Sequence, residues 1–328
     1  MNSRKIAIVC GGDSSEAEVS LRSAKGLYTF IDKTIYKVWI VVIKKGNWFV
    51  RLNEEETAPI DKNDFSFCQN GEKIHFDFAW VTIHGTPGED GRLQGYFDLL
   101  DIPYSCCGVL AAAVTFNKFT CNQFLKGFGV SVAESVLLRK GQKISDENVI
   151  ERVGLPCFIK SNVGGSSFGV TKVKRAEEIQ NAIAKAFVEG PEVIIESFLS
   201  GTEVTCGCYK TRKGPHLLPL TEVVSNNEFF DYDAKYKGEV KEITPARIPD
   251  ETRDHIQKIT SLIYDILGCK GIIRADYIIT DHKITLLEVN TTPGMTATSF
   301  IPQQVAKAGL QMSDVMCDII EDKFSLTL

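Results

Sequence analysis

The 328-residue sequence predicts an α/β fold whose middle third is α+β in character. In the first third, short apolar runs typical of buried strands alternate with helical segments, which indicates a parallel or mixed sheet covered by helices. In the middle third, a strand hairpin is followed by a helix and a further strand, an order typical of α+β folds. A chain of this length is expected to form two or three domains of about 100–200 residues each. We place three regions at 1–110, 111–197 and 198–328.

The first region begins with a strand at Lys5–Cys10, which is closed by two glycines. Its apolar part is too short for the hydrophobic segment of a secretory signal, which favours the strand. Ser15 and Glu18 have the spacing of a capping box, which predicts a helix from there to about Ile31. The other elements expected in this region and just beyond it are strands at 37–43 and 78–83 and helices at 92–100 and 110–126.

Beyond the helix at 110–126, the middle region is expected to contain two strands, Pro156–Lys160 and Gly169–Val173, joined by a loop of glycines and serines. A helix at 176–188 and a strand at 192–197 follow. In the last region we expect strands at 203–209 and 217–224, a polar loop at 225–239, a helix at 250–267, a hairpin of strands at 272–280 and 283–289, and two short helices.

Composition and charge exclude several classes of protein. The net charge is −5 and no polybasic patch occurs, so duplex nucleic acid and anionic membranes are not expected partners. No run of about 18 apolar residues is present, so no membrane-spanning helix is expected. The ten cysteines form no C-x-x-C pair and mostly lie in apolar runs, which fits a reducing cytoplasm rather than zinc or disulfide chemistry.

The strongest chemical pattern lies in the predicted hairpin near the C-terminus. Arg274 and Asp276 are two residues apart in one strand and so share a face, and Glu288 and Asn290 do the same in the next strand. Carboxylate and amide oxygens in otherwise apolar strands are the ligands that Mg²⁺ prefers, with phosphate oxygens completing its shell. The alternative is a structural ion pair between Arg274 and Asp276.

If Asp276 and Glu288 act together, the hairpin must place their side chains on the same face of the sheet. Residues directly opposite each other in a ladder point to the same face of the sheet. Asp276 can therefore face Glu288 only if the strands are joined by an odd-length loop such as 281–283, or if one strand contains a β-bulge.

Two glycine-containing segments are candidates for ligand binding. The segment 164–169 reads GGSSFG and follows Lys160, so its backbone N–H groups and serines are suited to phosphate, although a plain hairpin loop is an equal alternative. It lacks the lysine of a Walker A motif, and Gly11-Gly12 lacks the dinucleotide fingerprint. The segment 84–91 reads HGTPGEDG and follows a buried strand, where α/β sheets bind ligands. There His84 could meet a substrate carboxylate, or Glu89 and Asp90 could simply begin a helix.

Taken together, these segments resemble the D-alanine–D-alanine ligases of the ATP-grasp superfamily, from about Lys5 to about Ile320. The matching blocks are KIAIVCGGDSSEAEVS at 5–20, HGTPGEDGRLQG at 84–95, GGSSFG at 164–169, YDAKY at 232–236, GIIRADY at 271–277 and LLEVNTTPGMTATS at 286–299. The resemblance implies an ATP-grasp fold of three domains: an N-terminal Rossmann-like domain that covers the substrate, and two lobes whose antiparallel sheets clamp the nucleotide. It also implies a homodimer.

The activity implied by the resemblance is the ligation of two D-alanines to D-alanyl-D-alanine, a precursor for peptidoglycan synthesis. ATP first phosphorylates the carboxylate of one D-alanine, and the amine of the second attacks the acyl phosphate. Catalysis of this kind depends on positioning, charge stabilisation and exclusion of water. The cofactors implied are ATP and two Mg²⁺ or Mn²⁺ ions.

The resemblance also assigns roles to individual residues. The catalytic set is Glu16, which should hold the first D-alanine's ammonium, with Ser166, Tyr236, Arg274 and Gly294. His84 should lie near the first carboxylate and Ser299 should bind the second. Nucleotide contacts are expected from Lys118, Lys160, Glu196, Phe198, Leu199, Glu203 and Lys235, and metal contacts from Asp276, Glu288 and Asn290.

Several positions depart from the family's usual pattern or bear on specificity. Ser161-Asn162-Val163 follows Lys160 where the family usually has a proline, which predicts a less rigid loop. Phe198 stands where tryptophan is frequent, and Phe300 where leucine is frequent. Tyr236 favours the dipeptide, since relatives that make the D-lactate ester tend to carry phenylalanine there.

Three alternatives remain open at this point. One is a ligase that takes D-serine or D-lactate as second substrate, or another carboxylate–amine ligase. A second is a catalytically silent nucleotide-binding regulator, which would be expected to lose Arg274 or a metal ligand. The third is a nicotinamide dehydrogenase, which the missing fingerprint argues against.

Overall fold

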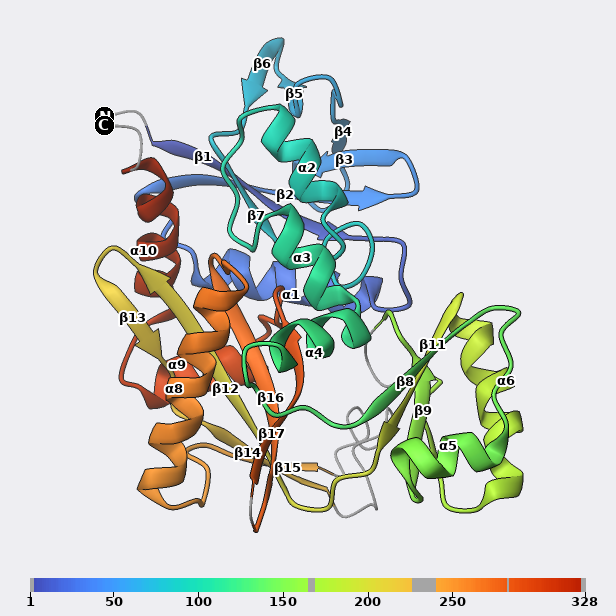
Figure 1. Cartoon of the computed structure of the whole chain (residues 1–328). Coiled ribbons are helices and arrows are strands. Elements are labelled where there is room, and N and C mark those ends of the chain that lie inside the picture. Colours follow the sequence, from blue (N-terminus) through green and yellow to red (C-terminus); the bar gives the residue numbers. More distant parts are fainter. Residues whose placement is uncertain (1–2, 165–168, 226–239, 282, 326–328) are drawn as a thin grey trace.

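The computed structural model describes residues 3–164, 169–225, 240–281 and 283–325 (Figure 1). Among these residues, three sheets of five, four and six strands follow one another along the chain, together with a small two-stranded hairpin. Their strands fall within the three predicted regions in order. The boundaries at 110 and 198 stay predictions.

The first sheet is mixed, as the alternation of strands and helices predicts. Its order is β4-β3-β2-β1-β7, and β1 runs parallel to both β2 and β7 while β2 and β3 are antiparallel. The strand bounds are Arg4–Gly11 (β1), Tyr36–Lys44 (β2), Asn47–Arg51 (β3), Thr57–Pro59 (β4) and Phe78–Val81 (β7), with Ser66–Gln69 (β5) and Glu72–His75 (β6) forming the separate hairpin. Strands β3 to β6 were not predicted from the sequence.

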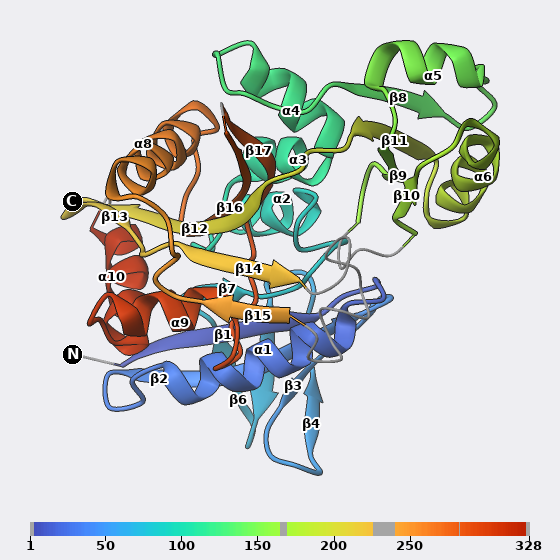
Figure 2. The same cartoon turned by 90° about the horizontal axis from the view of Figure 1, so that it is seen from below.

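Each face of this sheet has its own hydrophobic core. One core joins the sheet to α1 (Ala17–Phe30) and to two helices from the end of the chain, α9 (Phe300–Lys307) and α10 (Met312–Phe324). Figure 2 shows α1 lying along β1, with α9 and α10 next to it. The other core contains α2 (Arg92–Leu99) and the β5–β6 hairpin. The predicted capping box is wrong, because Glu16 is the residue before α1 and no side chain caps the helix there.

The single helix expected at 110–126 is two helices. They are α3 (Val109–Phe116) and α4 (Lys118–Lys126), separated by Asn117, whose backbone is extended. The Asn117 side chain accepts a hydrogen bond from Thr120 N at 2.9 Å and thereby caps α4. Asparagine is among the preferred N-cap residues, which explains the break. As a result, Lys118 is the first residue of α4.

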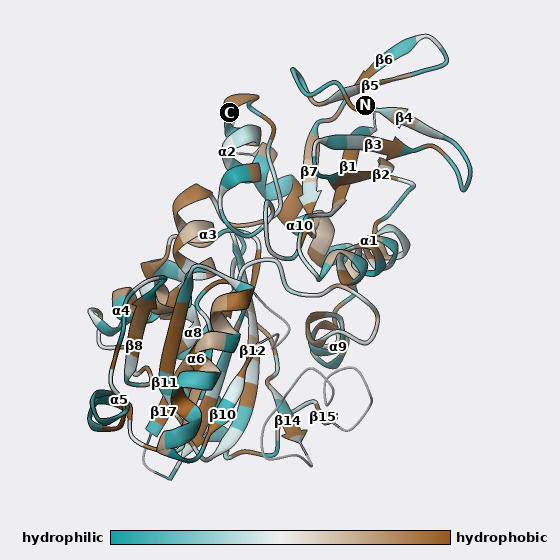
Figure 3. Ribbon diagram, turned by 90° about the vertical axis from the view of Figure 1, so that its right-hand side faces the viewer, coloured by the Kyte–Doolittle hydropathy of each residue, from teal (hydrophilic) through white to brown (hydrophobic). Residues whose placement is uncertain are grey.

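The second sheet is antiparallel, with the order β10-β9-β11-β8. Its strands are Ser135–Arg139 (β8), Cys157–Ser161 (β9), Thr171–Val173 (β10) and Glu192–Ser197 (β11). The predicted β9–β10 hairpin is confirmed. The two helices α5 (Asp146–Val153) and α6 (Ile179–Glu189), the latter preceded by a short 3-10 turn at Ala176–Glu178, share one core with this sheet. Figure 3 shows β8 and β11 largely hydrophobic and α5 largely hydrophilic on the outside. The sequence analysis missed β8 and α5.

The third sheet has the order β15-β14-β12-β16-β17, with β13 attached to β12, and all its pairs are antiparallel. Its strands are Thr202–Thr211 (β12), Gly214–Leu217 (β13), Thr221–Ser225 (β14), Val240–Ile243 (β15), Ile272–Thr280 (β16) and Lys283–Asn290 (β17). The strand expected at 217–224 is therefore the end of β13 and most of β14. Helix α8 (Asp250–Ile266) and α4 share a core with this sheet.

A β-bulge in the β16–β17 hairpin places Asp276 and Glu288 on the same face of the sheet. Asp276 stands opposite Glu288, whereas Tyr277 stands opposite Leu286, so Leu287 is the extra residue. Thr280 pairs with Lys283, which leaves a connection of two residues, and the odd-length loop is not used. The bulge is the alternative that the structure confirms.

The three sheets meet around α3 and α4, which lie between the first sheet and the other two (Figure 1). All ten cysteines are free thiols and eight of them are buried, as expected for small apolar side chains. In the part of the chain that the structure describes, no helix combines the length and apolar character needed to cross a membrane.

Candidate active site

A cavity of about 570 Å³ opens where the first sheet, α4 and the segment after β17 meet. Its wall includes the start of α1, the segment after β7 and the residues between β17 and α9. Eight of the predicted site residues line it: Glu16, His84, Lys118, Arg274, Glu288, Asn290, Gly294 and Ser299. The structure thus brings together residues that are up to 283 positions apart in the chain.

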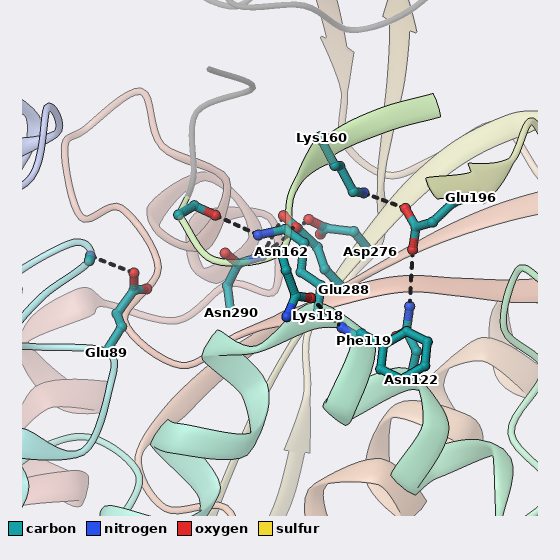
Figure 4. Close-up of polar contacts among 12 residues, drawn as sticks. Glu89, Lys118, Phe119, Asn122, Lys160, Asn162, Glu196, Asp276, Glu288 and Asn290 are labelled. Atoms are coloured by element: carbon teal, nitrogen blue, oxygen red, sulfur yellow. Dashed lines mark hydrogen bonds and ion pairs between the residues drawn. The ribbon is translucent and has the colours of Figure 1, made fainter. Parts of the chain in front are cut away.

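The carboxylates of the hairpin, Asp276 and Glu288, converge on Asn290 (Figure 4), and Glu288 and Asn290 line the cavity. Asn290 Nδ2 lies 3.3 Å from Asp276 Oδ2 and 3.3 Å from Glu288 Oε1, so the amide sits between the two acids. Arg274 donates from Nε to Asp276 Oδ1 at 2.8 Å and from Nη2 to Oδ2 at 2.7 Å. The ion pair considered as an alternative is therefore present, and it forms part of the cluster.

Cations around the cluster keep Glu288 ionised. Burial by itself would raise the pKa of Glu288, but Lys118, Lys160 and Arg274 lower it to about 2. Burial would likewise lower the pKa of Arg274, yet the neighbouring Asp276 and Glu288 carboxylates raise it well above its usual range. At neutral pH the cluster therefore presents full charges of both signs.

The donor set of the hairpin suits a divalent cation. Within the described residues, no group of three or more His, Cys, Asp or Glu side chains could hold a metal ion, and the candidate set consists of two carboxylates and one amide. These are hard oxygen ligands of the kind that Mg²⁺ takes in small number beside phosphate oxygens. Turning the Asn290 amide by 180° would point its oxygen between the two acids. The set fits the ion, although the metal role stays a proposal.

Lys118 connects this cluster with the glycine-rich segment. Its Nζ lies 4.0 Å from Glu288 Oε2 and donates a hydrogen bond to Gly164 O. The side chain is largely buried, since 13% of it is exposed. Lys118 therefore stands between the hairpin carboxylates and the point where the GGSSFG segment begins.

A second group of predicted residues gathers on β9 and β11, outside the cavity lining. Lys160 Nζ and Glu196 Oε2 are 2.5 Å apart, and Asn122 Nδ2 donates to Glu196 Oε1 at 3.4 Å (Figure 4). Burial would lower the pKa of Lys160, but the Glu196 carboxylate raises it overall. The lysine is thus a cation near the end of β9, a central strand of the second sheet.

The segment that follows β11 contributes an aromatic surface. The Phe198 ring meets Phe158 edge to face, with centroids 5.7 Å apart, and Lys172 Nζ lies 3.7 Å from the Phe198 centroid. Leu199 is next in the connection to β12. Glu203 lies in β12 opposite Ile278, and its charge contributes to raising the pKa of Arg274. The sequence analysis did not single out Phe158 or Lys172.

The residues assigned to the amino acids also line the cavity. Glu16 directly precedes α1, His84 lies in the segment after β7, and both line the cavity. Ser299 stands just before α9, but its hydroxyl bonds to Thr296, accepting from Thr296 N at 3.1 Å, rather than capping the helix. A Cβ on Gly294 would lie 3.0 Å from Ser299 Oγ, so this position leaves little room for a side chain.

Glu89 is the site residue that sequence reasoning missed. The carboxylate does not begin α2; it turns back and accepts from Gly85 N at 2.6 Å and from Thr292 Oγ1 at 2.7 Å. It therefore joins the segment after β7 to the segment after β17, and it lines the cavity. Burial, with a smaller contribution from the charge of Glu16, raises its pKa to about 7. The only local signal is a carboxylate within a glycine-rich turn after a buried strand.

Three predicted residues, Ser166, Lys235 and Tyr236, lie outside the described residues, as does the loop 226–239. The family's proline is absent after Lys160, but hydrogen bonds hold the chain in place at Asn162. Asn162 is fully buried and hydrogen-bonded on both its main chain and its side chain.

Two neighbouring antiparallel sheets, a glycine-rich hairpin connection on one and converging carboxylates on the other define the ATP-grasp class of fold. Two family models match the chain: "D-ala D-ala ligase N-terminus" at residues 5–107 and "D-ala D-ala ligase C-terminus" at residues 124–321. The chain belongs to the D-alanine–D-alanine ligase family. The family and the fold expected from the sequence are confirmed.

Individual proteins agree with this assignment. A D-alanine–D-alanine ligase of Bacteroides fragilis is 67% identical over 322 residues, which cover 98% of this chain and 99% of the relative. Among solved structures, the VanG D-Ala:D-Ser ligase of Enterococcus faecalis has a TM-score of 0.85 at 31% identity, covering 98% of this chain and 99% of the other. The D-alanine–D-alanine ligase of Bacillus anthracis complexed with ATP has a TM-score of 0.78 at 26% identity, with coverages of 99% and 98%.

Proposed function

We propose that the protein ligates two D-alanines to D-alanyl-D-alanine at the expense of ATP, as a step in peptidoglycan precursor synthesis. One structural observation carries the proposal. One cavity is lined by groups suited to an amino acid, Glu16, His84, Arg274 and Gly294, together with Glu288 and Asn290 of the hairpin. The B. fragilis ligase, similar over nearly the whole chain, supports the same reaction.

The chemistry requires two steps. A carboxylate is a poor acyl donor, because expelling an oxide ion is prohibitive. Transfer of the γ-phosphoryl group of ATP to the carboxylate oxygen of the first D-alanine gives an acyl phosphate and ADP. The amine of the second D-alanine then attacks the acyl carbon, the C–N bond forms, inorganic phosphate leaves and the amine loses its proton.

The cavity residues suit the handling of the two amino acids. Glu16 pairs with the ammonium of the first D-alanine, His84 lies beside its carboxylate, and Ser299 receives the carboxylate of the second. Arg274 uses Nε and Nη2 for Asp276, so Nη1 can face the oxyanion that develops on attack. The N–H of Gly294 is the second donor to that oxyanion, and such donors act because they are fixed before the reaction.

ATP is expected along β9, β11 and β12. Lys118 and Lys160 hold its phosphates, Glu196, Phe198 and Leu199 meet the adenine, and Glu203 meets the ribose. Asp276, Glu288 and Asn290 would hold two Mg²⁺ or Mn²⁺ ions, which when bound neutralise charge on the phosphate oxygens. Lys235 is proposed for the γ-phosphate, and Ser166 and Tyr236 for a hydrogen-bond network with Glu16.

A second candidate keeps the same first step and changes the second substrate. The similarity to the VanG D-Ala:D-Ser ligase favours D-serine as the alternative to be tested. Tyr236 argues for the dipeptide over the D-lactate ester. A silent regulator is disfavoured, because Arg274 and the proposed metal ligands are all retained.

The remaining predictions concern the protein as a whole. A homodimer, a cytoplasmic location, and the lack of nucleic-acid and membrane partners stay predictions that no contact in the structure tests.

The proposal is tested by measuring phosphate release from Mg·ATP with D-alanine, L-alanine, or D-alanine with D-lactate or D-serine. Release with D-alanine, none with L-alanine, and D-alanyl-D-alanine by mass spectrometry are the expected results. Release that requires a different amino acid, or no release with D-alanine while ATP still binds, would overturn the proposal.

A further inference from the structure

Asn162 is a fully buried amide that uses both ends of its side chain. It follows β9 and lies two residues from both Lys160 and Gly164. Its Oδ1 accepts from Phe119 N at 2.9 Å, and its Nδ2 donates to Glu192 Oε2 at 2.8 Å. Its main chain is engaged as well, since Lys118 N donates to Asn162 O at 3.2 Å and Asn162 N donates to Glu192 O at 3.0 Å.

Glu192, which accepts a hydrogen bond from Asn162, also binds residues next to α4 and in β8. Its Oε2 also accepts from Asn117 Nδ2 at 3.2 Å, and its Oε1 accepts from Arg139 Nε at 3.0 Å. Asn117 is the residue whose side chain caps α4. We call Asn117, Asn162 and Glu192 the clasp. The clasp ties the first turn of α4 to the ends of β9 and β11, which belong to the second sheet.

The clasp acts on Lys118. This residue begins α4 directly after Asn117, and both its N–H and that of Phe119 are held by Asn162. The Lys118 side chain then extends to Gly164 O and toward Glu288. The lining of the cavity includes Lys118 and Gly164 but none of the three clasp residues, so any effect of the clasp on a ligand passes through its neighbours.

We propose that Asn162 is a positioning residue that, through the clasp, holds Lys118 where it can bind the phosphates of the nucleotide. The proposal rests on the nucleotide site of the proposed function and adds a residue to it. An amide is required because the position needs one acceptor for Phe119 N and one donor for Glu192. A carboxylate at 162 would instead face the Glu192 carboxylate at hydrogen-bond distance, where two like charges repel.

The test is a double-mutant cycle of Asn162→Ala and Lys118→Met, with the Kd for Mg·ATP measured by calorimetry without D-alanine and the KM for ATP measured in turnover. Asn162→Ala alone is expected to raise both constants about tenfold, the size of coupling within one hydrogen-bonded network. In the Lys118→Met background the same change should add less than about twofold. Equal effects in both backgrounds, or unchanged nucleotide constants, would overturn the proposal.

Three further variants separate positioning from folding. Ser145→Ala removes the side-chain cap of α5 in the same lobe, away from the cavity, and should lower Tm without changing the Kd for ATP. Glu192→Gln keeps an acceptor oxygen for Asn162 and should stay within about threefold of wild type, whereas Glu192→Ala should resemble Asn162→Ala. If Asn162→Ala does not fold, Glu192→Ala takes its place in the cycle.

The measurement of ATP binding also distinguishes the failure of this proposal from the failure of the proposed function. If the wild-type protein binds ATP and the cycle is non-additive but no D-alanyl-D-alanine forms, the proposed function fails and the role of Asn162 stands. If the dipeptide forms and the cycle is additive, the role of Asn162 fails alone.

Discussion

Asp276 and Glu288 stand directly opposite each other in the β16–β17 ladder, and the extra residue Leu287 makes this possible. Successive side chains of a strand point to opposite faces, so a regular two-residue connection would have turned Glu288 away from Asp276. The bulge instead puts both acids within 3.3 Å of the Asn290 amide. Bulges next to active sites commonly re-aim a side chain in this way.

Replacing Arg274 by alanine is expected to lower kcat by about 10²–10³-fold, the usual cost of losing one oxyanion donor. The change also leaves Asp276 without its ion-pair partner. Steady-state phosphate release, with ATP binding measured separately, checks the prediction. Arg247→Ala is the matched control, because Arg247 pairs with Glu222 in the same sheet outside the cavity. A near-normal kcat in Arg274→Ala would remove the residue from this role.

Removing the charge of one proposed metal ligand should weaken the dependence on divalent cations. For Glu288→Gln we expect the Mg²⁺ concentration for half-maximal activity to rise at least about tenfold, because hard cations favour charged oxygen ligands. A chelator should stop the wild-type reaction, and Mg²⁺ or Mn²⁺ should restore it. Glu222→Gln serves as the control, and an unchanged Mg²⁺ titration for Glu288→Gln would contradict the assignment.

Glu89 predicts a particular dependence of stability on pH. Its pKa in the folded protein is raised from 4.5 to about 7, mainly by burial, so between these values the folded state binds the proton more tightly than the unfolded chain. This contribution to the free energy of unfolding is fully present below pH 4.5 and is lost as the pH rises toward 7.

Chemical denaturation of wild type and Glu89→Gln at several pH values tests this. The wild type should lose about 1–3 kcal/mol relative to the variant between pH 5 and pH 8. Parallel pH profiles for the two proteins would show that Glu89 does not titrate in this range.

The preference for D-alanine over D-lactate as second substrate is expected to depend on Tyr236. Tyr236→Phe should raise the use of D-lactate relative to D-alanine at mildly acidic pH, because the resembling ester-forming ligases tend to carry phenylalanine there. Product ratios by mass spectrometry measure the change. Tyr232→Phe, in the same loop, is the control, and the same ratio in Tyr236→Phe as in wild type would refute the specificity argument.

Much of the architecture follows from local patterns in the sequence. The apolar runs Ile6–Cys10 and Val193–Ile195 are uninterrupted and clearly bounded, and they lie in strands as predicted. The short strands β3 to β6 were missed because charged and polar residues interrupt their apolar pattern. The break between α3 and α4 was missed because it depends on one side chain, Asn117, capping its own helix.

Some features of the site could be predicted from the sequence, whereas its long-range contacts could not. The shared faces of Arg274 with Asp276 and of Glu288 with Asn290 follow from strand periodicity alone. Glu89 could not be placed, since its partner Thr292 is 203 residues away. Asn162 was missed for the same reason, because its partners Phe119 and Glu192 are 43 and 30 residues away. Local patterns predict periodicity, whereas such contacts depend on the assembled fold.

The packing of α10 against the first sheet has a consequence for synthesis on the ribosome. Val315, Met316 and Ile319 share one core with Ile6 and Ile8, so the earliest and latest parts of the chain complete each other. During translation the part of this face that α10 covers therefore stays open until α10 has emerged, although α1 already packs beside it. The first sheet therefore reaches its final packing only after α10 has been made, and until then this apolar surface is open to the contacts from which chaperones protect nascent chains.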